Sequence, residues 1–112
     1  MTYKIKSRIW IETENNVLLG EGRVQLLKAI MLTGSLSKAA KSLNMSYKKA
    51  WKLIDDVNKA SRQPVVTTSI GGQGGGGAQV TEYGQKLIHV FEEINKNCWD
   101  YLDQQVEKIK AL

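Results

Sequence analysis

The residues best suited to bind another molecule are four side chains within six positions: Tyr47, Lys48, Lys49 and Lys52. A lysine ammonium group pairs with guanine acceptors or neutralises a phosphate. A helix fits the major groove of duplex DNA, where side chains near its start reach the base edges. We therefore expect this cluster to bind double-stranded DNA, with Tyr47 and Lys48 on bases and Lys49 and Lys52 shared between bases and phosphates.

A second group of residues completes the predicted DNA-binding set. A lysine further along the same helix is expected to hold a phosphate, and the amide-rich start of the preceding helix is suited to another. A glycine tract can approach the DNA backbone closely and bring a glutamine to the minor-groove edge. The alternatives are a solvated lysine face and a hairpin tip without contacts. The members of this group are Ser35, Ser37, Lys38, Ser46, Lys59 and Gln73.

The charge of the chain is unevenly distributed along its length. Net charge is +5, with 12 Lys and Arg against 5 Asp and Glu in residues 1–81, and 4 against 6 in residues 82–112. We expect the first part to face a polyanion. No stretch approaches the roughly 20 apolar residues of a membrane helix, so a cytoplasmic location without membrane contact is expected.

Catalytic and metal-binding chemistry has few candidate residues. Cys98 is the only cysteine and His89 the only histidine, which leaves no intrachain disulfide and too few ligands for a Cys/His zinc site. Nine helical positions place the two side chains on opposite faces, so they form no dyad. We expect no enzymatic activity, no metal and no cofactor. His89 should be solvated, and Cys98 should be a small hydrophobe at an interface.

Two other nucleotide-binding patterns are weak. Residues 72–77 match the glycine pattern of dinucleotide-binding folds, but the following region predicts a long helix instead of a second parallel strand. Ala78 and Gln79 stand where a phosphate-binding loop needs Lys and Ser or Thr. Aromatic residues could also form a stacking platform for single strands, but periodicity assigns one of them, Trp51, to the core. The platform candidates are Tyr47, Trp51 and Trp99.

The elements that position these residues begin with a β-hairpin in residues 1–20. Apolar and polar residues alternate over residues 4–12, as in a half-buried strand, and residues 17–19 can return beside it. A first helix is predicted over residues 22–33, ending at Gly34.

Residues 34–61 predict a helix-turn-helix. Ser35 or Ser37 can cap the second helix, Asn44 suits a left-handed turn, and Ser46 can cap a third helix over residues 47–61. In the third helix, one stripe is predicted to be core and three lysines to point about 180° away. The core stripe is Ala50, Trp51, Ile54 and Val57, and the opposite face carries Lys48, Lys52 and Lys59.

The remaining residues predict a wing and a long helix. Residues 65–80 are two strands joined by the glycine tract, and residues 81–112 form a helix of about seven turns. Its near-heptad apolar spacing predicts a homodimer, the alternative being a stripe that only closes the monomer core. The predicted interface residues are Leu87, Phe91, Ile94, Cys98, Tyr101 and Leu102.

Together these elements predict one domain over residues 1–112: an α+β, mainly helical winged helix-turn-helix with an N-terminal hairpin and a long C-terminal dimerisation helix. Three stretches of this arrangement resemble the N-terminal DNA-binding domain of ModE-type molybdate-responsive transcription regulators, whose helix-turn-helix is related to that of LysR-type regulators. They are residues 20–30, residues 34–51 with the string Ser-Tyr-Lys-Lys-Ala-Trp, and residues 71–84 with the Gly-Gly-Gly-Ala wing.

The resemblance implies a dimeric winged helix that binds an operator through its third helix and wing. Lysines stand where the family usually has arginines, which weakens any inference of bidentate guanine contacts. The chain ends at Leu112 without the oxyanion-sensing module of full-length family members, so we expect no molybdate site and control, if any, through a separate effector or sensor protein. The alternative function is a winged-helix protein-interaction module that does not bind DNA.

Overall fold

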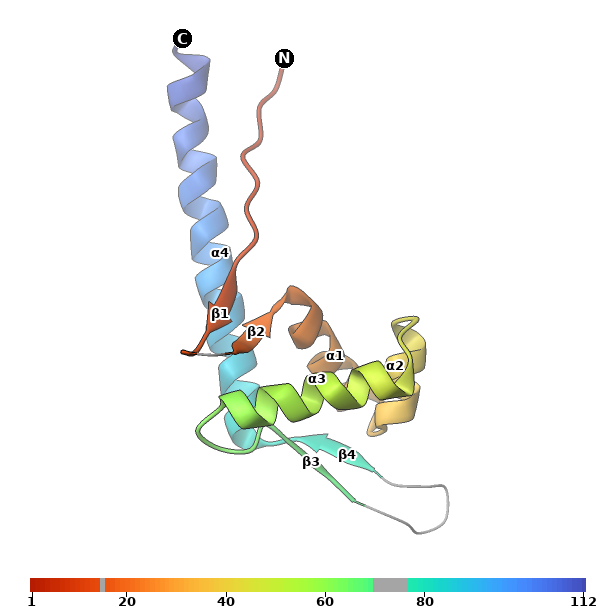
Figure 1. Ribbon diagram of the computed structural model, residues 1–112. Helices are drawn as coiled ribbons and strands as arrows, with labels where there is room; N and C mark the ends of the chain where they lie inside the picture. The colour runs from red at the N-terminus through yellow and green to blue at the C-terminus, as the bar shows by residue number, and fades with distance from the viewer. Residues whose placement is uncertain (15, 70–76) are drawn as a thin grey trace.

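The computed structural model describes residues 1–14, 16–69 and 77–112, which form four helices and two antiparallel hairpins (Figure 1). This is the α+β, mainly helical winged helix-turn-helix that the sequence predicts. In chain order the elements are β1 Trp10–Glu12, β2 Val17–Gly20, α1 Glu21–Thr33, α2 Leu36–Ser42, α3 Tyr47–Ala60, β3 Val66–Thr68, β4 Ala78–Val80 and α4 Glu82–Lys110.

Capping residues set the helix-turn-helix as predicted. Gly34 ends α1 in the left-handed conformation, with φ of 68°, and its N–H donates to the Ile30 carbonyl over 2.7 Å. The Ser35 hydroxyl oxygen accepts from the Lys38 amide at the start of α2, and the Ser46 hydroxyl oxygen accepts from the Lys49 amide at the start of α3. Asn44 occupies the turn with φ of 53°. Because local signals determine each boundary, α2 and α3 lie where the sequence places them.

The core is built from one side of every helix and from both hairpins. Within α1, Leu26 is buried whereas Met31, which shares the helical periodicity, is half exposed. Apolar spacing alone does not define the rotation of a helix about its axis. The residues of α1 that become buried are therefore decided by the elements that pack against it. The main buried residues are Leu19, Val24, Leu26, Leu27, Ile30, Leu36, Ala39, Ala40, Ala50, Ile54, Val57, Val65, Val66, Ala78, Val80, Ile88 and Phe91.

The N-terminal strand is shorter than predicted. The alternation over residues 4–12 predicts pairing throughout, but only Trp10–Glu12 form a strand, because β2 has four residues and offers no partner further up the chain. The predicted alternation persists without pairing: Ile5 and Ile9 are half-buried, whereas Lys4, Lys6 and Arg8 are exposed. Side-chain packing, not a ladder of backbone hydrogen bonds, therefore orients this segment.

The second hairpin joins α3 to α4. Strands β3 and β4 pair in register with Val66 opposite Val80, and β3 is shorter than the predicted strand. Thr81 caps α4 by accepting from the Gly84 amide over 3.0 Å, and its hydroxyl donates to the Pro64 carbonyl over 2.7 Å. A Cβ on Gly84 would lie 2.6 Å from the Val65 carbonyl oxygen, so only glycine permits this approach of helix and strand.

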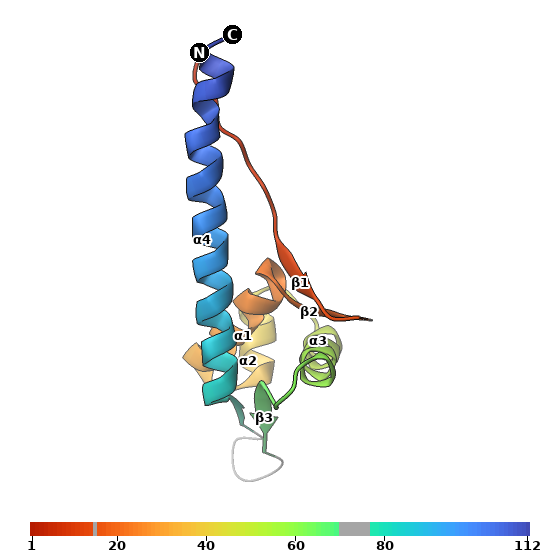
Figure 2. The ribbon, with the colours of Figure 1, turned by 90° about the vertical axis from the view of Figure 1, so that its left-hand side faces the viewer.

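Helix α4 makes the molecule long. Its 29 residues span about 43 Å at 1.5 Å per residue. The radius of gyration is 17.2 Å, against about 13 Å for a compact chain of similar size, and the longest extent is 63 Å. The N-terminal segment runs beside α4, so that both termini lie at the same end (Figures 1 and 2). Among the described residues, no helix is long and apolar enough to cross a membrane.

Candidate nucleic-acid interface

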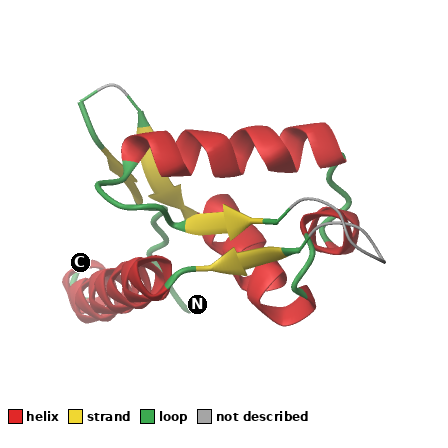
Figure 3. Ribbon diagram, turned by 90° about the horizontal axis from the view of Figure 1, so that it is seen from below, coloured by secondary structure: helices red, strands yellow, loops and turns green. Residues whose placement is uncertain are grey.

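Helix α3 and the β3–β4 hairpin extend to the same side of α4 when the molecule is viewed from below (Figure 3). Ala50, Ile54 and Val57 of α3 are buried, which fixes the rotation of the helix about its axis. The residues predicted to bind DNA from this helix all lie on its exposed surface. They are Ser46 at the cap, Tyr47, Lys48, Lys49, Lys52 and Lys59.

The lysines of α3 differ in their ionic partners. The Lys52 ammonium lies 3.2 Å from the Asp56 carboxylate, and the Lys59 ammonium lies 2.8 Å from that of Asp55. The hydrogen bond from Lys59 to Asp55, reinforced by the attraction between the two charges, raises the pKa of Lys59. The charge of each lysine is partly neutralised by the neighbouring carboxylate, a pairing that was not predicted although the four-residue spacing on the helix indicates it.

The first turn of α3 carries the cations without such neighbours. Among the described residues, no carboxylate lies within 4.0 Å of the amines of Lys48 or Lys49. The exposed N–H groups of this turn add partial positive charge at the same end of the helix. The strongest positive potential on α3 therefore lies at its start.

The predicted residues of α2 divide by their roles. Ser35 is half-buried and caps the helix, because its hydroxyl oxygen accepts from the Lys38 amide over 3.2 Å. Ser37 and the Lys38 side chain are exposed on the first turn. Gln73, predicted for the wing tip, lies outside the described residues.

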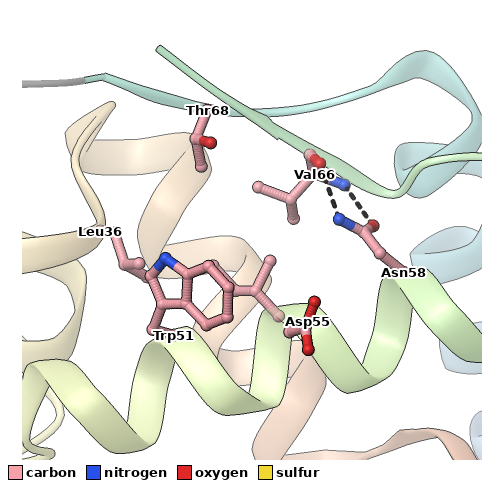
Figure 4. Close-up of a pocket in the computed structure, with 7 residues that line it drawn as sticks. Leu36, Trp51, Asp55, Asn58, Val66 and Thr68 are labelled. Carbon is pink, nitrogen blue, oxygen red and sulfur yellow. Dashed lines mark hydrogen bonds between the residues drawn. The ribbon is translucent and has the colours of Figure 1, made fainter. Parts of the chain in front are cut away.

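Asn58 holds the wing against α3, a role that sequence analysis missed. Its side-chain oxygen accepts from the Val65 and Val66 amides over 2.8 and 3.1 Å, and its amide nitrogen donates to the Val66 carbonyl over 2.9 Å. Figure 4 shows the two hydrogen bonds between Asn58 and Val66. The side chain thus completes the hydrogen bonds of the strand on its open edge. An asparagine at the end of a helix, just before a proline and a β-branched run, was the available signal.

Trp51 is not the core residue that periodicity predicts, because its side chain is 51% exposed. Steps of 100° place Trp51 at the margin of the stripe centred on Ala50, Ile54 and Val57, and Leu53 on the other margin packs against the core instead. Tyr47, one turn before, is 56% exposed. Trp99 lies on α4 with the Lys4 ammonium 5.5 Å from its ring centroid, so the three aromatic residues form no common platform.

The predicted dimer residues of α4 separate into two groups. Phe91 is only 3% exposed and belongs to the monomer core, so its assignment to the interface is wrong: the inner face of α4 packs on the head before any partner can. Cys98 is half-buried with its sulfur 3.5 Å from the Ser7 hydroxyl, and Leu102 is half-buried on the same side. Leu87 packs at the edge of the core.

A separate row of apolar residues faces solvent on α4. Val90, Ile94 and Tyr101 are each about half exposed, and their spacing of four and seven residues aligns them along the helix. We call these three residues the α4 stripe. Only Ile94 and Tyr101 of the stripe were predicted from sequence. His89, on another face, is exposed with its ring nitrogen 3.9 Å from the Glu93 carboxylate.

Comparisons with known proteins agree with this architecture. The molybdenum transport protein ModE of Azotobacter vinelandii is 34% identical over 106 residues, covering 95% of this chain and 39% of that protein. The DNA-binding transcriptional dual regulator ModE of Escherichia coli is 43% identical over 83 residues, covering 71% and 32%. The molybdenum-pterin-binding protein MopB of Rhodobacter capsulatus is 46% identical over 76 residues, covering 68% and 28%. The chain thus spans about a third of these relatives.

No model of a known protein family matches the chain. Among solved structures, a mutant of MepR from a multidrug-resistant S. aureus clinical isolate aligns with a TM-score of 0.53, covering 83% of this chain and 73% of that one. Identity there is 16%, so the likeness concerns the fold alone. By sequence similarity and by fold, the chain is a winged-helix domain of the ModE type, related to the N-terminal region of the ModE transcriptional regulators.

Proposed function

We propose that the chain is a sequence-specific regulator that binds double-stranded DNA, with α3 in the major groove and the β3–β4 wing beside it. The observation that supports this most directly is the pair of exposed lysines, Lys48 and Lys49, on the first turn of a helix whose opposite face is buried. Side chains in that position of a recognition helix reach base edges. The Escherichia coli relative is a DNA-binding transcriptional regulator by name.

Roles within the interface follow from the ionic partners. Tyr47 and Lys48 are proposed to contact bases, and Lys49 bases and phosphate. Lys52 and Lys59 are proposed to act on phosphates at a reduced strength, because Asp56 and Asp55 compete for their charge. Gln73 is proposed to reach the minor groove from the wing, and Ser37 with Lys38 to contact the backbone beside α2.

We further propose that the chain acts as a homodimer through the α4 stripe. The exposed residues Val90, Ile94 and Tyr101 form a line along one face of α4, whose C-terminal part extends beyond the other helices (Figure 1). Apolar surface that the monomer leaves uncovered on a long helix is typical of association sites. Two copies of α3 about 34 Å apart would bind half-sites one helical turn apart, so the operator is expected to be an imperfect palindrome.

Selection of binding sequences from a random duplex pool, followed by titration of the recovered site at several salt concentrations, tests the proposal. A palindromic motif is expected, with affinity falling steeply between about 50 and 200 mM salt because counterions are released from phosphates. No motif and no shift of random duplex at low salt would contradict it, and would favour the interaction module. Affinity independent of salt would refute the phosphate contacts.

A further inference from the structure

A small pocket lies between α3 and the wing, beside the proposed DNA-binding face. Figure 4 shows Trp51 projecting from α3 between Leu36 of α2 and Val66 of β3. Most of its lining residues are apolar, and the other three, Asp55, Asn58 and Thr68, carry polar groups. Its lining residues are Leu36, Trp51, Ile54, Asp55, Asn58, Val66 and Thr68.

Trp51 is half exposed although it is a large apolar side chain on an otherwise basic helix surface. It lies three residues after Lys48 and one before Lys52, so it borders the cationic face of α3 on the side of the wing. Any duplex that contacts Lys48 and Lys52 must therefore pass close to the indole ring.

The polar residues that line the pocket restrict what can enter it. The Asp55 carboxylate disfavours a phosphate, because like charges repel and its partner Lys59 only partly offsets its charge. The Asn58 amide already makes three hydrogen bonds to β3, so it is not free to pair with a base edge. What remains is an apolar surface formed by Leu36 and Trp51, with the Thr68 side chain at its border.

We propose that this pocket takes the C5-methyl group of a thymine in the major groove, which makes Trp51 a specificity-determining residue. The inference rests on the proposed DNA-binding function and adds a named base to it. The thymine methyl is the one apolar group that base pairs present in the major groove, and apolar side chains are the contacts that distinguish it. An adenine–thymine pair is therefore required at this position of each half-site.

The test uses the operator recovered with the unmodified protein, with each thymine replaced in turn by deoxyuridine, which removes only the methyl group. At one thymine in each half-site, affinity is expected to fall about fourfold, the value for burying one methyl-sized group. In Trp51→Ala the same replacement should have no effect, and binding to the thymine operator should be weaker by at least about that factor. Binding to random duplex should be unchanged.

Two further variants control for loss of structure. Trp10→Ala removes a tryptophan of similar exposure from β1, outside the pocket, and should retain the full deoxyuridine effect. Trp51→Phe keeps an apolar ring and should retain part of the deoxyuridine effect. Trp51→Ala should still unfold in one cooperative thermal transition, at a midpoint lowered by the loss of the buried half of the side chain, so binding is measured well below that midpoint.

The outcomes separate this inference from the proposed function. If the protein binds no duplex, the proposed function itself is wrong. If it binds with the expected salt dependence but Trp51→Ala shows the same deoxyuridine penalties as the unmodified protein at every thymine, the thymine pocket is refuted while DNA binding stands. A uniform loss on every duplex would place Trp51 on the DNA backbone and would equally refute base recognition.

Discussion

The two ends of the molecule differ in how their residues are buried. In the head, which comprises α1 to α3, both hairpins and the first turns of α4, every element contributes to one core. In the tail, which comprises residues 92–112 and the extended residues 1–9 beside them, Val106 alone is buried among the described residues. The head can hold its shape by its own packing, whereas the tail has almost no buried core of its own. We infer that the head supplies recognition and the tail supplies association.

The head and the tail also differ in charge, but the difference is smaller than the charge counts along the sequence indicate. Residues 1–81 carry most of the positive charge, but Lys4 and Lys6 belong to the segment that lies along α4, with Lys4 over Trp99. These cations therefore belong to a segment beside the more acidic helix α4 and do not extend the basic face of α3. The positive charge near α3 is therefore smaller than the count for residues 1–81 indicates. Within α3, most of the charge that no carboxylate offsets belongs to Lys48 and Lys49.

The largest effect is expected at Gly84, where the first turn of α4 packs against the wing. In Gly84→Ala the new Cβ would lie 2.6 Å from the Val65 carbonyl oxygen and 2.8 Å from a methyl group of Val80, so strand and helix must move apart. We expect the free energy of unfolding to fall by about 3 kcal/mol, as for overpacked cores, measured by urea denaturation. Gly22→Ala is the control, because a Cβ at that position would have nothing within 4 Å of it, and the substitution should not destabilise the fold. Equal effects of the two substitutions would argue against close packing of α4 on Val65 and Val80 at Gly84.

The next effect concerns the head alone. Asn58→Ala leaves the Val65 and Val66 amides without their side-chain acceptor, and we expect a loss of about 2 kcal/mol in unfolding free energy. Operator affinity should also fall, because the wing is no longer held against α3. Asn97→Ala, at an exposed position of α4, should change neither quantity. Normal stability and affinity in Asn58→Ala would show that the strand pairing suffices to hold the wing.

A substitution in the α4 stripe should affect the tail without affecting the head. Ile94→Lys places a charge in the proposed dimer contact, and we expect the dimer dissociation constant to rise about tenfold in sedimentation equilibrium. The monomer should unfold normally, since Ile94 is half exposed. His89→Lys adds the same charge on another face of the helix and should leave association intact. A dimer equally tight in Ile94→Lys would place the interface elsewhere.

The smallest effect distinguishes lysines within the head. Lys48→Ala should weaken binding to the operator more than binding to random duplex, because Lys48 is proposed to contact a base, and should reduce the slope of log affinity against log salt by less than about 0.9, the value for one phosphate contact. Lys59→Ala should reduce the slope by clearly less than about 0.9, because Asp55 already neutralises part of its charge. Asp55→Asn should restore the full contribution of Lys59. A full slope change for Lys59→Ala in the presence of Asp55 would show that the ion pair opens on DNA.

Local sequence signals were sufficient for the helix-turn-helix. Ser35, Ser46, Asn44 and Gly34 act through hydrogen bonds and backbone preferences that span only three or four residues, so they could be identified without neighbours. The exposed position of the α3 lysines could also be predicted, because the helical repeat of 3.6 residues places them opposite Ala50, Ile54 and Val57. The role of Gly84 could not be predicted, because it depends on the close approach of Val65, which lies just before β3 and far from Gly84 along the chain. The role of Asn58 had a local signal, because the strand that it holds begins a few residues after α3 ends.

The amino-acid order alone thus determined where the helices of the head begin and end, which face of α3 is basic, and that a long amphipathic helix follows the wing. Only the tertiary structure decided that Trp51 is exposed and that Phe91 belongs to the monomer core. The physical reason is that periodicity defines the angle between side chains on one helix but not the direction of the stripe. That direction is chosen by the packing of all elements at once.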